Sequence, residues 1–279
     1  MKDLIIGCST NYTWDTIKYW VLSIRRSGFE GDIALILMNC DSKTAYQVAS
    51  CGVNIIGFNQ DKDGNLVYQS KLPVHVERFL HIYEHLSTHE YRYVITTDVK
   101  DVIFQTNPSK FLEQQLGQRQ QLLFASESIL YKDEPWGDNN LLETYGPYIH
   151  EKFRDNEIYN VGVLGGRHEA MKSLAINIFT AAINRPIPIC DQSTFNFMIS
   201  QLPYKDNSYS RYMKSEDGWA CQLGTTADPS KIDEFRPKLL EPSPKFENGK
   251  VLTSTGKEFC IVHQYDRTEW RREIEAQYE

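Results

Sequence analysis

The segment YVITTDVKDVIFQTNP, residues 93–108, is the part of the sequence that decides the fold. Its first five residues form a continuous apolar and β-branched run, which is typical of a strand buried on both faces. The run ends at Asp98, and a second carboxylate, Asp101, follows three residues later. Ligands of open α/β sheets bind at the carboxyl ends of the strands. We therefore expect the two acids to lie in a binding site.

Strand-like and helix-like segments alternate around this run. Short apolar runs predict strands at 4–6, 33–38, 53–58, 93–97, 122–125, 161–164 and 259–262. Apolar residues at helical spacing, together with capping signals, predict helices at 13–26, 44–50, 73–86, 173–183, 193–199 and 267–278. The pattern predicts an α/β fold with a mainly parallel central sheet, helices on both faces and a small antiparallel part near 202–257.

Composition limits the classes of partner. The chain has 279 residues, of which 41% are hydrophobic and 24% charged, and this is ordinary for a globular protein. Its net charge of −7 disfavours nucleic acid, because a phosphate backbone requires a basic face. No Gly/Ser-rich linker or repeat divides the sequence, so we expect one domain over residues 1–279.

Cysteine usage and hydropathy bear on localisation. The six cysteines are far apart and form no CxxC pair, which is typical of free thiols in a reducing compartment rather than of a zinc site. No apolar stretch is long enough to predict a transmembrane segment, and residues 4–6 are too short for a signal-peptide core. These features predict a cytoplasmic protein and leave peripheral membrane association open.

The pair of acids favours a metal site. Neighbouring carboxylates raise each other's pKa unless a cation lies between them. Hard divalent cations take carboxylate oxygens together with substrate phosphates. The alternative is that Asp98 caps a turn and Asp101 faces solvent. The apolar run at 102–104 argues against a simple exposed loop.

An apolar strand, two close acids, an apolar stretch and a proline together resemble the metal-binding motif of GT-A glycosyltransferases. The sequence is most similar to glycosyltransferase family 8, the group of glycogenin and the bacterial lipopolysaccharide galactosyltransferases. It departs from the motif at Lys100, which holds the usual place of the second Asp, and the acid moves to Asp101. The resemblance implies a GT-A fold and Mn²⁺ or Mg²⁺ at Asp98. Asp101 then replaces the missing ligand, or Lys100 neutralises phosphate.

Two segments resemble the nucleotide-binding parts of the family. One is IIGCSTNY, residues 5–12, and the other is the predicted helix that carries Arg78. The alternatives are an ordinary strand-to-helix loop and a surface arginine. The residues that the resemblance assigns to the nucleotide are Cys8, Ser9, Thr10, Asn11, Tyr12 and Arg78.

Three later segments resemble the sugar- and metal-binding parts. IYNVGVLGG (158–166) implies that Asn160 and Gly162 lie beside the sugar, and a strand with packing glycines is the alternative. DQSTFN (191–196) implies that Asp191 binds sugar hydroxyls and Gln192 lies near the reacting carbon. The alternative for Asp191 is a helix N-cap. IVHQYDR (261–267) implies His263 as a third metal ligand and Arg267 over the pyrophosphate.

The resemblance implies a metal-dependent enzyme that moves a hexose from a nucleoside-diphosphate sugar, carried by UDP, to a hydroxyl of a carbohydrate or another acceptor, with retention of configuration. The nucleotide-binding half then spans about 1–105 and the sugar- and acceptor-binding half about 106–279, with acceptor loops expected at 131–157 and 204–242. One alternative is a relative that binds nucleotide-sugar or carbohydrate without catalysis. Others are a nucleotidyltransferase, which normally has a Gly-rich phosphate loop, and a phosphohydrolase with Asp98 as nucleophile, which needs an acid where Lys100 stands.

Overall fold

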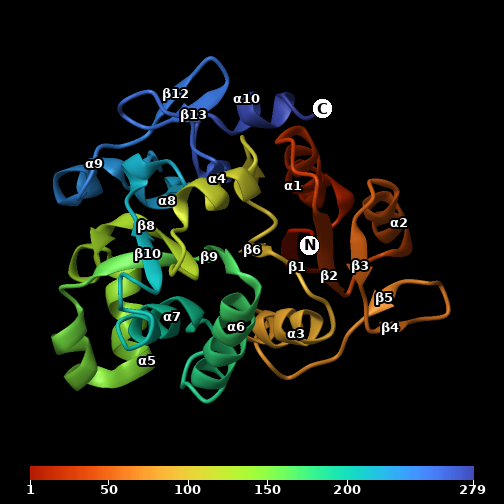
Figure 1. Ribbon diagram of the computed structural model, residues 1–279, viewed down its shortest axis with the longest axis horizontal. Coiled ribbons are helices and arrows are strands. Elements are labelled where there is room, and N and C mark those ends of the chain that lie inside the picture. The colour runs from red at the N-terminus through yellow and green to blue at the C-terminus, as the bar shows by residue number, and fades with distance from the viewer.

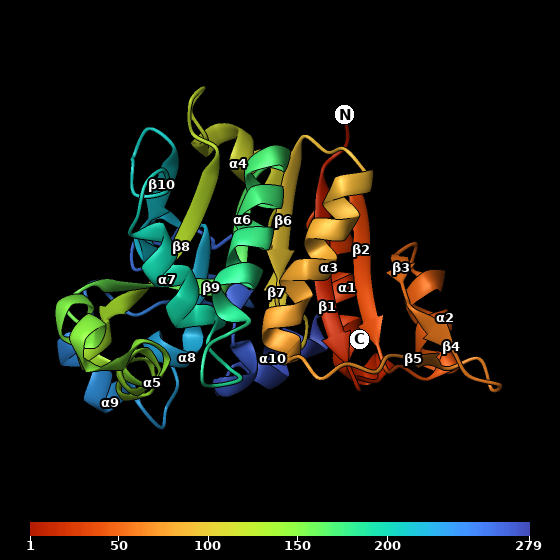
Figure 2. The ribbon, with the colours of Figure 1, turned by 90° about the horizontal axis from the view of Figure 1, so that it is seen from below.

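The computed structural model describes residues 1–279 and has one large mixed sheet with helices on both faces (Figures 1 and 2). The strand order is β10-β8-β9-β6-β1-β2-β3. Strand β9 runs antiparallel to both neighbours, and all other pairs are parallel. The strands are β1 Leu4–Thr10, β2 Asp32–Met38, β3 Asn54–Ile56, β6 Tyr93–Thr97, β8 Leu122–Leu130, β9 Glu157–Arg167 and β10 Ser210–Met213.

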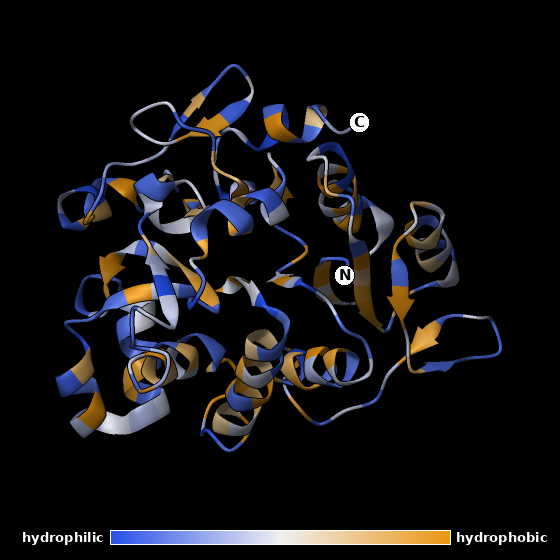
Figure 3. Ribbon diagram, in the orientation of Figure 1, coloured by the Kyte–Doolittle hydropathy of each residue, from blue (hydrophilic) through white to orange (hydrophobic).

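The predicted α/β class is confirmed. Alternate residues of the central strands face opposite sides of the sheet, and helices cover them on both sides. Leu4 and Ile6 of β1 pack towards α3, α6 and α7, whereas Ile5 packs towards α1 and α4. Figure 3 shows the hydrophobic colour along β2, as expected of a strand whose last six residues are buried. The longer helices are α1 Trp14–Arg26, α2 Ser42–Ser50, α3 Val74–Thr88, α4 Pro108–Gln115, α5 Pro135–Phe153, α6 His168–Ala182 and α7 Asp191–Ile199.

A smaller sheet crosses the end of β6 and contains three strands in the order β11-β14-β7. These are β7 Val102–Phe104, β11 Ala220–Gln222 and β14 Ile261–His263. The remaining short elements are β4 Asn59–Gln60, β5 Leu66–Val67, β12 Lys245–Glu247, β13 Lys250–Leu252, α8 Leu223–Thr226, α9 Ile232–Phe235, α10 Arg271–Ala276 and the 3-10 turns Tyr131–Asp133, Ser215–Asp217, Arg236–Lys238 and Tyr265–Arg267.

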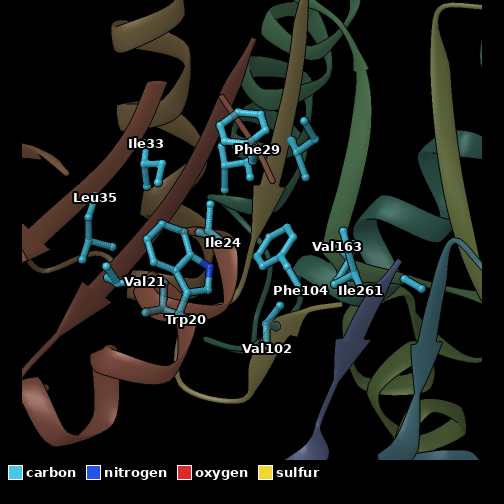
Figure 4. Packing of buried hydrophobic residues seen from close by; sticks show 14 of the residues in the cluster. Trp20, Val21, Ile24, Phe29, Ile33, Leu35, Val102, Phe104, Val163 and Ile261 are labelled. Atoms are coloured by element: carbon cyan, nitrogen blue, oxygen red, sulfur yellow. The ribbon is translucent and has the colours of Figure 1, made fainter. Parts of the chain in front are cut away.

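Trp20 fixes the corner between the two sheets. Its indole is fully buried, and its Nε1 donates a hydrogen bond of 2.8 Å to Oγ1 of Thr97, the last residue of β6. Figure 4 shows Trp20 among Val21, Ile24 and Phe104, so that α1 and β7 share one core. Burying a side chain of this size contributes several kcal/mol. The chain is therefore held firmly just before Asp98.

The expected antiparallel part near 202–257 is only partly confirmed, because β12 and β13 form an antiparallel pair but β10 and β11 run parallel to their neighbours. Three further sequence expectations are wrong. Residues 131–157 are not an open acceptor loop, because they contain the 19-residue helix α5; Gly146 and Pro147 kink it and obscured its periodicity. The predicted helix at 267–278 is only Arg271–Ala276, preceded by a 3-10 turn. Asp191 is the first residue of α7 and not its N-cap, which is Cys190.

No helix combines the length and the apolar character that are needed to cross a bilayer. The six cysteines are all free.

Side chains of the DQSTFN segment attach α7 to β9. The main-chain N–H of Tyr159 donates to Oδ1 of Asn196 at 2.8 Å, and Nδ2 of Asn196 donates to the Tyr159 carbonyl at 2.8 Å. The N–H of Val161 likewise donates to Oε1 of Gln192 at 2.8 Å. The pairing of β9 with β8 is irregular in this region, and the side chains of α7 supply hydrogen-bond partners for the β9 main chain there. The spacing of Gln192 and Asn196 thus has a structural cause.

We predict that Asn196→Ala lowers the free energy of unfolding by about 2–4 kcal/mol, because it removes a buried side chain and leaves the main-chain N–H and C=O of Tyr159 without these partners. Urea denaturation followed by circular dichroism measures the change. Asn59→Ala is the control, because Asn59 is exposed, and we expect it to stay within about 0.5 kcal/mol. Equal stabilities of the two variants would contradict this role of Asn196.

Candidate metal centre and adjoining cavities

Strand pairing brings three potential metal ligands together from distant parts of the chain. Asp98 follows β6, Asp101 precedes β7, and His263 ends β14, which pairs antiparallel with β7. The main-chain N–H of Gln264 donates to the Asp101 carbonyl at 2.7 Å. One ligand atom of each of the three side chains lies within 4.8 Å of the other two. The Asp–Asp–His group can hold a metal ion.

The imidazole of His263 is oriented for ligation. Its Nδ1 lies 2.6 Å from Oε1 of Gln222, the residue opposite it on β11, so Nδ1 carries the proton and donates. Its Nε2 is buried, has no hydrogen-bond partner, and lies 3.4 Å from Asp98 Oδ2 and 3.6 Å from Asp101 Oδ1. A ring nitrogen that faces two carboxylate oxygens needs either a proton or a metal cation between them. A hydrogen bond at the second ring nitrogen is the usual support of a ligating histidine.

Gly162 leaves the space that an ion requires. A Cβ at this position would lie 2.7 Å from Asp98 Oδ2 and 2.8 Å from His263 Cε1. The Gly162 carbonyl also accepts a hydrogen bond of 2.8 Å from the main-chain N–H of Asp98. Glycine at this position therefore leaves room for the Asp98 carboxylate and the His263 ring, and its carbonyl anchors the Asp98 main chain. Two carboxylates and one imidazole are a donor set that suits a divalent cation.

Arg78 of α3 connects the metal cluster to Asp191. Its Nη1 pairs with Asp98 Oδ1 and its Nη2 with Asp191 Oδ2 at 2.9 Å. Burial opposes ionisation of Asp98, but Arg78 and then His263 outweigh it and hold the pKa of Asp98 well below its usual range. Burial dominates at Asp191 and raises its pKa despite Arg78. The arginine is occupied by two carboxylates rather than free to bind phosphate, although it lines both cavities described next.

Two cavities meet at this cluster. The larger, of about 450 Å³, is lined by residues that include Glu127, Trp136, Asn160, Gly162, Asp191, Gln192 and Thr225. The smaller, of about 250 Å³, is lined by residues that include Cys8, Ser9, Thr10, Tyr12, Lys100 and Asp101. The residues common to both are His75, Arg78, Asp98, His263, Gln264 and Arg267. Two of the candidate metal ligands, Asp98 and His263, therefore line both cavities, and Asp101 lines the smaller one beside them.

Every sequence-predicted site residue except Asn11 lines one of these cavities. Asn11 instead makes the turn after β1, where it is exposed and has a φ of 57°. Lys100 pairs with Asp266 at 3.4 Å, away from the candidate ligands, so Asp101 and not Lys100 joins the cluster. Burial raises the pKa of the Cys8 thiol to about 12, which keeps it neutral.

Two residues of the site were not found from the sequence. Gln222 lies in a region with a weak pattern, and only its pairing opposite His263 reveals it. Glu127 carried a signal, because it comes two residues after the apolar run 122–125, and Asp98 likewise comes just after 93–97. Strand β8 is parallel to β6 through the antiparallel β9, so both acids lie near the same edge. Of the two tryptophans in the predicted acceptor segments, Trp219 is core and Trp136 is 52% exposed at the larger cavity.

No protein-family model matches the chain, and no curated protein matches it. The family resemblance therefore rests on the short segments quoted above.

We predict that Gly162→Ala weakens Mn²⁺ binding by at least about tenfold, because the added methyl group overlaps Asp98 Oδ2 and the His263 ring. Isothermal titration calorimetry with Mn²⁺ measures it. Gly117→Ala is the matched control, since a Cβ there meets only Gln120 at 3.5 Å. Unchanged Mn²⁺ affinity in Gly162→Ala would place the ion elsewhere.

We predict that Mn²⁺ binding weakens as the pH falls from 8 to 6. Burial disfavours the charged imidazole, but Asp101 and Asp98 outweigh it and raise the pKa of His263. Burial also raises the pKa of Asp101, so both groups hold their protons to higher pH than usual. Metal ligands must be deprotonated, and each displaced proton costs up to about tenfold in affinity per pH unit below its pKa.

The measurement is the Mn²⁺-induced rise in melting temperature at pH 8, 7 and 6. His263→Gln should abolish most of the rise at every pH, whereas His89→Gln, at an exposed position, should behave as the wild type. A rise that does not change with pH would contradict a role for His263.

Proposed function

We propose that this chain is a metal-dependent glycosyltransferase with a GT-A fold. It would transfer a hexose from a nucleoside-diphosphate sugar, with UDP as the favoured carrier, to a hydroxyl of a carbohydrate or another acceptor. One observation carries the proposal: the Asp98, Asp101 and His263 cluster lies where two cavities meet. A diphosphate at that junction would extend its nucleoside into one cavity and its sugar into the other.

The smaller cavity suits the nucleoside. Cys8, Ser9 and Thr10 end the central strand β1, and Tyr12 adds an aromatic ring to the same wall. At the junction, Arg267 and His75 line both cavities and offer N–H donors to phosphate oxygens. Arg267 has no ion-pair partner within 4.0 Å, so its guanidinium is available to an anion.

The larger cavity suits the sugar and the acceptor. Asp191, Gln192 and Asn160 are all more than 90% buried yet line it, and together they offer carboxylate and amide groups to sugar hydroxyls. Trp136 lies exposed at the same cavity and offers a ring face for an acceptor sugar. Arg78 holds Asp191 in a fixed position relative to Asp98, and so it couples the sugar end to the metal end.

The residues present fit Mn²⁺ or Mg²⁺, held by Asp98, Asp101 and His263, with Gln222 orienting the imidazole. When bound, such an ion acts as a Lewis acid that stabilises negative charge on the leaving diphosphate. The chain itself would orient the sugar through Asp191 and Gln192 and neutralise phosphate charge through Arg267. Transfer with retention of configuration is the outcome that the family resemblance implies.

Specific observations bear on two alternatives to this function. A binding-only relative is favoured by Lys100, which departs from the motif and pairs with Asp266. A nucleotidyltransferase would use the same junction but would need a phosphate-binding loop, and Gly7 in β1 faces the core, where a Cβ would meet Val99 at 2.5 Å. Gly7 therefore serves packing.

A thermal-shift panel tests the donor class. UDP-glucose, UDP-galactose, GDP-mannose and UDP are each added with and without Mn²⁺. Binding at 100 times Kd stabilises the folded state by about 2.7 kcal/mol. We expect a UDP-sugar to raise the melting temperature only with Mn²⁺. The absence of any nucleotide response would overturn the proposal.

We predict that Asp98→Asn abolishes Mn²⁺-dependent hydrolysis of the UDP-sugar selected by the panel, by at least about 100-fold, because it removes a ligand charge and an Arg78 partner. UDP release measures it. Asp15→Asn is the control, since the Asp15 side chain is 87% exposed. Binding without UDP release by the wild type would favour the binding-only alternative, and full activity of Asp98→Asn would remove the central assignment.

A further inference from the structure

Glu127 is presented by an irregular stretch of β8. Register shifts between Phe124 and Ser126 and between Ser126 and Leu130 break the β8–β9 ladder around it. Ser128 has a φ of 58°, in the left-handed region that non-glycine residues avoid, and its N–H donates to Ser126 Oγ at 2.7 Å. Bulges and strained backbone at such a place re-aim a side chain. Here the result is that the Glu127 carboxylate lines the larger cavity.

Three side chains from three elements donate to this carboxylate. Oε1 accepts from Gln192 Nε2 of α7 at 2.6 Å and from Asn160 Nδ2 of β9 at 2.8 Å. Oε2 accepts from Thr225 Oγ1 of α8 at 3.1 Å. All three donors are more than 90% buried. Both Glu127 oxygens accept in these hydrogen bonds, so Glu127 dictates which end of each amide faces it.

The oxygen ends of the two amides are also fixed. Gln192 Oε1 accepts from the Val161 N–H at 2.8 Å, and Asn160 Oδ1 accepts from the Gly162 N–H at 2.7 Å. Flipping either amide would set oxygen against the Glu127 carboxylate and N–H against a main-chain N–H. An amide nitrogen has two hydrogens. Each amide therefore donates one N–H to Glu127, and its second N–H has no protein acceptor although both residues line the larger cavity.

We propose that Glu127 is a positioning residue that holds Gln192 and Asn160 as hydrogen-bond donors towards the sugar of the donor substrate. The inference rests on the proposed function, because it assigns the larger cavity to that sugar. Glu127 acts through its hydrogen-bonding geometry: its oxygens gather the two amides and Thr225 at one point, and a shorter side chain would not reach all of them.

Two variants separate geometry from charge. In Glu127→Gln, the new oxygen can accept from both amides and the new NH₂ can donate to Thr225 Oγ1, so the arrangement persists without the charge. In Glu127→Asp, the charge persists but the carboxylate is drawn back by one methylene group. Glu143→Ala, at an exposed position of α5, is the control. Circular dichroism melts establish that each variant is folded at the temperature of the assay.

The probes are UDP, UDP-glucose and UDP-galactose with Mn²⁺, titrated calorimetrically. For the UDP-sugar that binds the wild type more tightly, we expect Glu127→Asp to raise Kd about tenfold and Glu127→Gln to change it less than about threefold. The Kd of UDP should stay within about twofold in both variants, because the hydrogen bonds of Glu127 go to Asn160, Gln192 and Thr225 and not to a candidate metal ligand. A defect that was merely structural would move UDP and UDP-sugar together.

Three outcomes would overturn the inference. Equal, large losses in both variants would mean that the negative charge is required as well as the position, which contradicts a role that is purely geometric. Wild-type affinity for the UDP-sugar in Glu127→Asp would mean that the amides need no support. Wild-type protein that binds none of the probes would overturn the proposed function and this inference with it, whereas wild-type protein that binds UDP and UDP-sugar leaves the first two outcomes to decide on Glu127 alone.

Discussion

The short antiparallel pairing of β7 with β14 is the constraint on which the centre of the molecule depends. Residues 102–104 and 261–263 pair directly, although about 160 residues separate them along the chain. This pairing sets His263 beside Asp101, and the parallel strand β11 adds Gln222 on the other side. Neither partner strand has more than three residues, so the core around Trp20 and Phe104 must hold the corner in place. The positions of the candidate metal ligands therefore depend on the packing of this core.

Buried charge is organised around Arg78. One guanidinium serves Asp98 and Asp191, which lie 93 residues apart in the sequence. Burying three charged groups is unfavourable unless they are paired, and removing one partner leaves an uncompensated charge. A divalent ion at Asp98 would add positive charge to the same group. The arginine therefore aligns the two acids and opposes the effect of burial on both, although it outweighs burial only at Asp98, and the proposed donor site uses both acids.

Much of the fold could be predicted because its strands are continuous apolar runs. The strand at 93–97 was predicted to the residue, and the acids after it were found from the rule that ligands lie at strand ends. Helix α5 was missed, since Gly146 and Pro147 interrupt the pattern that marks a helix. The contact of His263 with Asp101 depends on long-range pairing of short strands, and the family resemblance supplied it where periodicity gave no signal. The same limit hid Gln222.

Strand β9 has a mechanical consequence. It joins β6, from the first part of the chain, to β8, from the second, and the β6–β9 ladder runs from Tyr93 opposite Arg167 to Thr97 opposite Val163. A hinge motion that separated β6 from β9 to open the two cavities would break the main-chain hydrogen bonds in the middle of the sheet. The strands that line both cavities therefore belong to one continuous hydrogen-bonded sheet. Any motion that admits a large molecule or releases one has to come from the segments above it, such as α5 and the turns around α8 and α9.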